Sequence, residues 1–266
     1  MLPPVYHIAL QVAVSLVLSF GVVFILVILT GDPNIEEYNI LGEVFGPAIY
    51  LSGALSILLF SLLYIRTKKD FIPLPRSKST VMPIVVVMFI AANFAVSAGI
   101  QAVQNMLETD LPTNAMTDFE ASPMSLMGLL LFVFIAAPVA EELCFRGLMQ
   151  NQLCRRFPFW AANLIQGAIF GAIHRIPIQV GYAFALGLFL GWLYQRTGRL
   201  SVVIVAHIVF NCTPILMGFL ALFAPGYTQL MGSTAPLALK VFLPASVVFF
   251  AGWIVLGKKL QPTEEI

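Results

Sequence analysis

Long apolar runs constrain the fold of this chain more than any other feature of its sequence. Its 266 residues are 59% hydrophobic and only 10% charged. A helix that spans the hydrocarbon core of a membrane needs about 20 apolar residues. About eight such runs can be placed, at residues 6–30, 44–65, 81–106, 124–153, 158–174, 178–195, 200–223 and 237–257. The sequence therefore predicts an all-α, polytopic integral membrane protein, a bundle of about eight transmembrane helices forming a single domain over residues 1–266.

The fifth and sixth runs are the least regular part of this pattern. The fifth run, 158–174, is short, and it is open from the sequence whether both runs cross the membrane fully. Pro177 is expected to start the sixth helix, because its missing N–H costs nothing in a first turn. Gly167-x-x-x-Gly171 and Gly187-x-x-x-Gly191 predict close packing of helix backbones in lipid.

Charges between the runs predict the orientation in the membrane. Lys and Arg residues fill the second, fourth and sixth connections and the C-terminal tail, whereas the first and third connections carry only acids among their charged residues. Because basic loops stay on the cytoplasmic side, both termini are predicted to be cytoplasmic. The net charge of +1 provides no basic face for phosphates, so no nucleic-acid partner is expected. The sequence leaves the oligomeric state undetermined.

One apolar run contains ionisable residues that need an explanation. Glu141, Glu142 and Arg146 lie inside the run that ends near residue 153, where charged groups are costly. In a helix, Glu142 and Arg146 are four residues apart and share a face, whereas Glu141 points about 100° away. We therefore expect Arg146 to neutralise Glu142, which leaves Glu141 for chemistry.

Two further pairs of residues stand out in apolar surroundings. Phe170 and His174 are one helical turn apart, and so are His207 and Asn211. Taken singly, a buried His or Asn commonly forms a hydrogen bond between helices. In combination, one carboxylate, two imidazoles and one carboxamide supply a general base, a second group to hold water and hydrogen-bond donors for an oxyanion. These are the parts of a hydrolase that uses water directly, and the short loops place its active site inside the bundle.

Several alternatives remain open at this point. A metal-dependent membrane hydrolase would use the same residues, since Glu and His are zinc ligands, although the His-Glu-x-x-His spacing is absent. A non-enzymatic transport protein with a proton relay would also bury acids and imidazoles. Cys144, Cys154 and Cys212 lack Cys-x-x-Cys spacing and are predicted to be small core residues. No serine or cysteine is well placed to act as a covalent nucleophile.

The three motifs resemble those of a known family. Glu141-Glu142-x-x-x-Arg146, Phe170-x-x-x-His174 and His207-x-x-x-Asn211 occur in the order found in the CAAX protease and bacteriocin-processing (CPBP) intramembrane endopeptidases, which include the Ras-converting CAAX endopeptidase. The resemblance covers residues 122–223, which we expect to be the catalytic core. Non-catalytic immunity proteins that only retain the motifs are a further alternative.

The resemblance implies roles for seven residues. It implies a glutamic endopeptidase without metal or other cofactor, in which Glu141 activates the attacking water and His174 holds that water. His207 and Asn211 would stabilise the oxyanion. Glu142, Arg146 and Phe170 would support the site. The implied substrate is a peptide or a lipidated protein, such as a prenylated CAAX C-terminus, reached from the bilayer and from a cavity that opens to the cytoplasm.

Overall fold

The computed structural model describes residues 54–70 except 56, residue 74, and residues 81–108, 127–174 except 129, 176–223 and 235–260. Within these ranges the chain is helical, without a β-strand. The predicted all-α class is therefore confirmed for the described chain. The first predicted run, 6–30, and most of the loops that would carry the acidic connections lie outside the described residues.

The chain divides into two compact units, each built from two segments of sequence. The first unit comprises residues 1–71 and 115–156, and the second comprises residues 72–114 and 157–266. In the first unit, a helix over Ile57–Thr67 is followed by the 3₁₀ turn η1 (Lys68–Asp70). The same unit contains a continuous helical segment made of η3 (Phe132–Ala136), α5 (Ala137–Glu142), η4 (Leu143–Gln150) and α6 (Asn151–Cys154).

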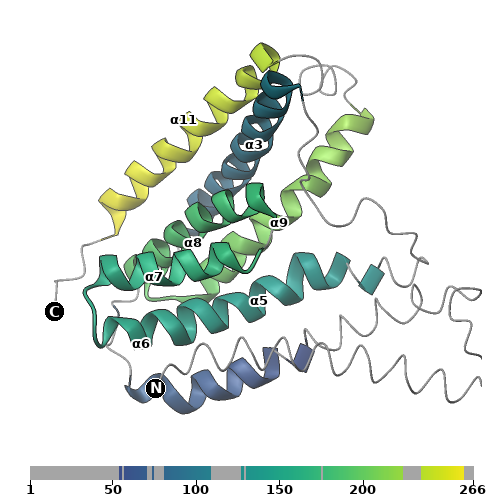
Figure 1. Ribbon diagram of the computed structural model, residues 1–266. Helices are drawn as coiled ribbons and strands as arrows, with labels where there is room; N and C mark the ends of the chain where they lie inside the picture. The colour runs from purple at the N-terminus through teal and green to yellow at the C-terminus, as the bar shows by residue number, and fades with distance from the viewer. Residues whose placement is uncertain are drawn as a thin grey trace, which may run out of the picture. The chain divides into compact units, whose positions relative to one another are not determined.

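Five helices form the described part of the second unit. They are α3 (Met82–Leu107), α7 (Phe159–Ala172), α8 (Pro177–Thr197), α9 (Leu200–Phe223) and α11 (Ala235–Lys259). Helix α3 packs against α9 and α11, and α8 packs against α7 and α9 (Figure 1). The helix pair α7–α8 and the pair α3–α9 therefore share one core through α8 and α9.

The predicted runs agree closely with these helices. Helix α3 begins within a residue of the third run, and Pro177 lies in the first turn of α8 as expected. Four described stretches are long and apolar enough to cross a membrane, namely Met82–Leu107, Pro177–Thr197, Leu200–Gly218 and Lys240–Lys259. Helix α7 has 14 residues and spans about 21 Å, which is less than the roughly 30 Å of hydrocarbon. The fifth run is thus short in the structure too.

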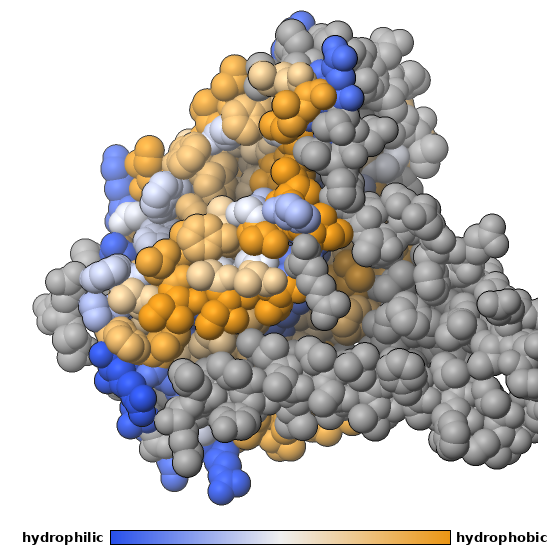
Figure 2. Space-filling model, viewed as in Figure 1, coloured by the Kyte–Doolittle hydropathy of each residue, from blue (hydrophilic) through white to orange (hydrophobic). Residues whose placement is uncertain are grey.

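The outward faces of the second unit are suited to lipid. Large apolar side chains such as Trp160 on α7 and Val247 on α11 are 70% and 67% exposed. Figure 2 shows that apolar residues form most of the visible surface of these helices. Such contiguous exposed apolar surface is uncommon in soluble monomers. Together with the four long apolar helices, it identifies the chain as a helical membrane protein.

The close packing predicted from the glycine spacing is present between α7 and α8. A Cβ added at Gly187 would lie 3.1 Å from the Cα of Gly167 and 3.2 Å from Cδ1 of Phe170. A Cβ added at Gly171 would lie 2.9 Å from the backbone oxygen of Val180. Glycine at these positions lets the two backbones approach, and it places the Phe170 ring against α8.

The glycines of this hairpin provide a test of the packing. Gly171→Ala is expected to lower the free energy of unfolding by about 1–3 kcal/mol, the usual effect of overpacking, because the new methyl group meets backbone. Gly181→Ala is the matched control, since nothing lies within 4 Å of its added Cβ. Unfolding of both variants in detergent micelles measures the difference. Equal stability of the two variants would contradict the close approach at Gly171.

Candidate active site

The two adjacent acids lie where the helical segment of the first unit changes its hydrogen-bond spacing. Glu141 and Glu142 end the short α5, with the π-helical segments η3 before and η4 after it. Pro138, in the first turn of α5, has no N–H to donate to the preceding turn. π-Helical turns occur frequently at functional sites. The backbone is therefore irregular on both sides of the acids.

The predicted ion pair is present. Arg146 Nη1 lies 2.6 Å from Glu142 Oε1, and both side chains are 0% exposed. Because burying two charges costs free energy unless the geometry is good, this pair is a specific feature rather than a surface contact. Glu142 and Arg146 are four residues apart, as the sequence pattern required.

Glu141 is not isolated from this pair. Its side chain is half-buried, and Arg146 interacts electrostatically with Glu141 as well as with Glu142. The predicted pairing of Arg146 with Glu142 stands, and the charge of Arg146 also acts on Glu141.

The surroundings hold Arg146 in place. Asn151 Nδ2 donates hydrogen bonds to the backbone oxygens of Arg146 and Gly147, each at 2.9 Å. The Arg146 guanidinium carbon lies 5.9 Å from the centre of the Phe145 ring, within the range of a cation–π interaction. A side-chain amide and an aromatic ring thus support the backbone and the charge of the buried arginine.

In the second unit, Phe170 and His174 lie at the end of α7. The helix ends at Ala172, so His174 occupies the following turn rather than the helix predicted to include it. The expectation that the two side chains point the same way is nevertheless confirmed, since their ring centres are 5.0 Å apart in an edge-to-face arrangement. Phe170 is fully buried and His174 is half-buried.

The end of α7 also determines the tautomer of His174. The backbone N–H of His174 donates to the Gly171 oxygen at 3.1 Å, and its Nδ1 lies 2.8 Å from the Phe170 oxygen. A carbonyl oxygen only accepts, so Nδ1 must carry the proton. In the neutral ring, Nε2 then holds the lone pair and can accept a hydrogen bond from water.

His207 and Asn211 lie one turn apart on α9. The His207 side chain is buried, and its ring centre is 5.8 Å from that of Phe170, edge to face. Phe170 therefore contacts both imidazoles, one from the turn after α7 and the other from α9. Asn211 is half-buried on the same helix.

The seven predicted residues thus fall into two groups. Glu141, Glu142 and Arg146 belong to the first unit, and Phe170, His174, His207 and Asn211 belong to the second. The structure brings together the residues of the ion pair in one unit and the three rings in the other. That all seven share one active site stays a prediction.

Sequence reasoning missed two amides that support the second group. Asn163 Nδ2 donates to the Leu188 oxygen at 3.0 Å, and Gln166 Nε2 donates to the Gly187 oxygen at 2.9 Å. These bonds join α7 to α8 next to Phe170. The signal was present in the sequence as two amide side chains inside an apolar run.

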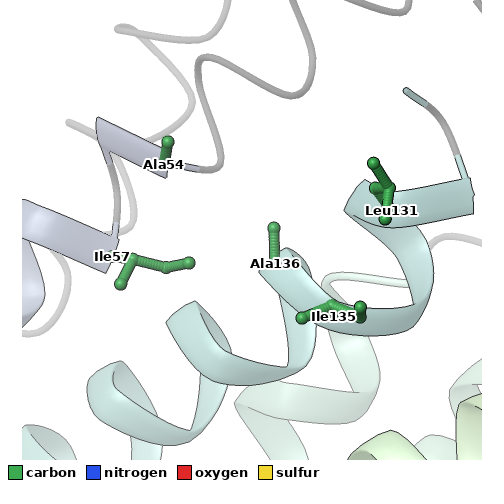
Figure 3. Close-up of a pocket in the computed structure, with 5 residues that line it drawn as sticks. All are labelled: Ala54, Ile57, Leu131, Ile135 and Ala136. Atoms are coloured by element: carbon green, nitrogen blue, oxygen red, sulfur yellow. The ribbon is translucent and has the colours of Figure 1, made fainter. Parts of the chain in front are cut away.

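Three other kinds of feature bear on the chemistry of the described residues outside the three motifs, namely cysteines, pockets and groups of metal ligands. The three cysteines are free thiols; Cys144 is buried, as predicted for a core residue, whereas Cys154 and Cys212 are only partly buried. A pocket of about 130 Å³ in the first unit is lined by Ala54, Ile57, Leu131, Ile135 and Ala136, all apolar (Figure 3). This pocket includes no candidate residue. Among the described residues, no three His, Cys, Asp or Glu side chains are grouped as metal ligands.

Comparison with known proteins bears on the motif region. Residues 123–213 match the family model described as "Type II CAAX prenyl endopeptidase Rce1-like". All seven motif residues lie within this match. The predicted resemblance to the CAAX endopeptidases is confirmed for residues 123–213, which are about a third of the chain.

Two curated relatives match the same chain. A Bacillus subtilis (strain 168) protein named "Putative membrane peptidase YdiL" is 34% identical over 83 residues, which are 31% of this chain and 34% of that protein. The Arabidopsis thaliana protein "CAAX prenyl protease 2" is 31% identical over 114 residues, covering 35% of each. The match spans about a third of the length of each relative. No solved structure matches the chain.

The buried ion pair can be tested by a double-mutant cycle. Arg146→Met and Glu142→Met should each lower the free energy of unfolding by about 3–5 kcal/mol, because each leaves one charge buried without its counter-ion. The double variant should lose much less than the sum of the two. Denaturant unfolding in micelles measures all four proteins. Additive losses would show that the two residues do not stabilise each other.

Proposed function

We propose that this protein is an intramembrane endopeptidase that hydrolyses a peptide bond with water activated by Glu141. The observation that carries the proposal is the presence of all three motifs, intact and in order, within the matched residues 123–213. We propose residues 122–223 as the catalytic core.

In the proposed reaction, the Glu141 carboxylate takes a proton from a water molecule that His174 holds through Nε2. The resulting hydroxide attacks the scissile carbonyl carbon, and His207 and Asn211 donate hydrogen bonds to the oxyanion. The tetrahedral intermediate collapses with cleavage of the C–N bond. The proton held by Glu141 passes to the leaving amine, so that one water is consumed and a carboxylate and an amine are formed.

Two features of the structure support these roles. The Nδ1–H of His174 donates to the Phe170 oxygen, so the nitrogen with the lone pair is the one that turns away from the backbone. The Phe170 ring contacts the imidazoles of both His174 and His207, so the two histidines lie beside the same aromatic ring.

The proposed substrate is a peptide or a lipidated protein. The relative from Arabidopsis thaliana is named a CAAX prenyl protease, and a prenylated C-terminus has an apolar chain for the bilayer and a peptide for water. The membrane is thus a second partner of the reaction. We further propose that both termini are cytoplasmic and that the site opens to the cytoplasm.

The decisive experiment is Glu141→Gln, assayed with a prenylated CAAX peptide and purified protein in lipid nanodiscs. The change keeps the size of the side chain but removes the base, which contributes roughly 10²- to 10⁴-fold or more to the rate, so hydrolysis should fall below detection. Glu108→Gln, at the end of α3, is the control and should retain activity.

The same assay tests the metal-dependent alternative. Exhaustive chelation should leave the hydrolysis by the unmodified protein intact. Loss of activity that zinc specifically restores would favour the metal-dependent hydrolase. Retention of turnover by Glu141→Gln would contradict the proposed base.

The roles of His207 and Asn211 predict a specific kinetic effect. His207→Ala and Asn211→Ala should each lower kcat by roughly 10²- to 10³-fold, the usual loss of one oxyanion donor, with little change in KM. Steady-state kinetics over a range of peptide concentrations separates the two parameters. An increase in KM alone would make the residue a substrate contact.

The proposed orientation predicts accessibility from the cytoplasm. In a background without the three native cysteines, a cysteine at Ser201, near the start of α9, should react with an impermeant maleimide in inside-out vesicles only. A cysteine at Glu108 should instead react in intact cells. The reverse pattern would overturn the orientation.

A further inference from the structure

Helix α9 carries His207 and Asn211 and also contains a proline. Pro214 lies inside the helix, three residues after Asn211. In an α-helix, the N–H of a residue donates to the carbonyl four residues earlier, and proline has no N–H. The Phe210 carbonyl therefore lacks its usual intrahelical donor. In a segment suited to cross lipid, water is not available to replace it, so another group of the protein must do so.

Asn93 supplies the missing donor from another helix. Its Nδ2 lies 2.9 Å from the Phe210 oxygen, although the two residues are 117 positions apart in sequence. The Asn93 side chain is buried on α3, and the Ser97 hydroxyl, one turn later on α3, donates to Asn93 Oδ1 at 3.3 Å. This second bond orients the amide so that its N–H₂ group points at Phe210.

The neighbouring carbonyl also receives a side-chain donor. Thr213 Oγ1 donates to the Val209 oxygen at 2.7 Å. Bonds of this type, together with a proline, bend helices and loosen their regular geometry. The direction of α9 near Pro214 therefore depends on a few side-chain hydrogen bonds. Among the described residues, only Asn93 donates from another helix to the Val209 or Phe210 carbonyl.

We propose that Asn93 is a positioning residue for His207 and Asn211. Phe210 lies between them in the chain, one residue before Asn211 and three after His207. By bonding the Phe210 carbonyl, Asn93 fixes the segment of α9 that places His207 against the Phe170 ring. The inference rests on the proposed function for its effect on catalysis, and on the hydrogen bond alone for its effect on α9.

The test is a double-mutant cycle between Asn93 and Pro214. Asn93→Leu retains the size of the side chain but removes the donor, and it should lower kcat by roughly 10- to 100-fold with KM nearly unchanged, as expected for misplaced catalytic groups. Pro214→Ala restores an N–H that can bond the Phe210 carbonyl. In the Pro214→Ala background, Asn93→Leu should therefore cost less than about threefold in kcat.

A matched control distinguishes this effect from general disturbance of α3. Asn105→Leu makes the same change near the end of the same helix, where Asn105 accepts a hydrogen bond from Gln101 of α3. It should leave kcat within about threefold of the unmodified protein. If Asn93→Leu cannot be purified, Asn93→Ala takes its place in the cycle.

Amide hydrogen exchange provides a readout that does not need activity. Asn93→Leu should increase exchange over residues 207–213 of α9, and Pro214→Ala should reverse the increase. If exchange behaves in this way but the unmodified protein hydrolyses no peptide, the proposed function fails and the positioning of α9 by Asn93 stands. Unchanged exchange, or an equal loss of kcat with and without Pro214, would overturn the inference.

Discussion

The structure depends on one constraint, which is that a helix in lipid must satisfy its backbone polar groups within the protein. The candidate residues lie where this is hardest. Glu141 and Glu142 follow Pro138 and lie between two π-helical segments. His174 follows the end of α7. His207 and Asn211 lie on either side of Phe210, whose carbonyl has no intrahelical donor because Pro214 lacks an N–H. Each of the three motifs therefore coincides with an interruption of regular helical hydrogen bonding.

Side chains bond backbone carbonyls near each of these interruptions. Asn151 bonds two carbonyls of η4, His174 Nδ1 bonds the Phe170 carbonyl at the end of α7, and Asn93 bonds the Phe210 carbonyl of α9. Where a side chain bonds the carbonyl at an irregular turn, the helix can change the direction of nearby side chains without leaving that carbonyl unsatisfied in an apolar environment. Proteins tolerate such local departures from regular structure mainly at functional sites. This coincidence supports the proposed site independently of the motif spacing.

Much of this was predictable because helical periodicity is local. The spacing of four residues predicted the Glu142–Arg146 pair and the contact of Phe170 with His174, and the missing N–H of Pro177 predicted the start of α8. The apolar runs predicted α3, α8, α9 and α11 for the same reason, since each is defined by consecutive residues.

Other features depended on contacts that no local pattern encodes. The end of α7 at Ala172 follows from a tightened last turn, in which the His174 N–H bonds Gly171 rather than Phe170. The bond from Asn93 to Phe210 joins residues 117 apart, and only the packing of α3 on α9 brings them together.

The polar residues of the described helices separate into two kinds by what they bond. Amides and hydroxyls such as Asn93, Asn163, Gln166, Thr197 and Thr213 donate to backbone carbonyls. Such hydrogen bonds join helices or bend them, and they require no charged side chain. The ionisable motif residues differ in part, because Glu142 and Arg146 bond each other. His174 Nδ1 donates to a backbone carbonyl as the amides do, but its Nε2 then remains an acceptor. A carboxylate or imidazole is more costly to bury than an amide that could make the same backbone bond. The proposed proton transfer would give ionisable groups at these positions a function that amides cannot perform.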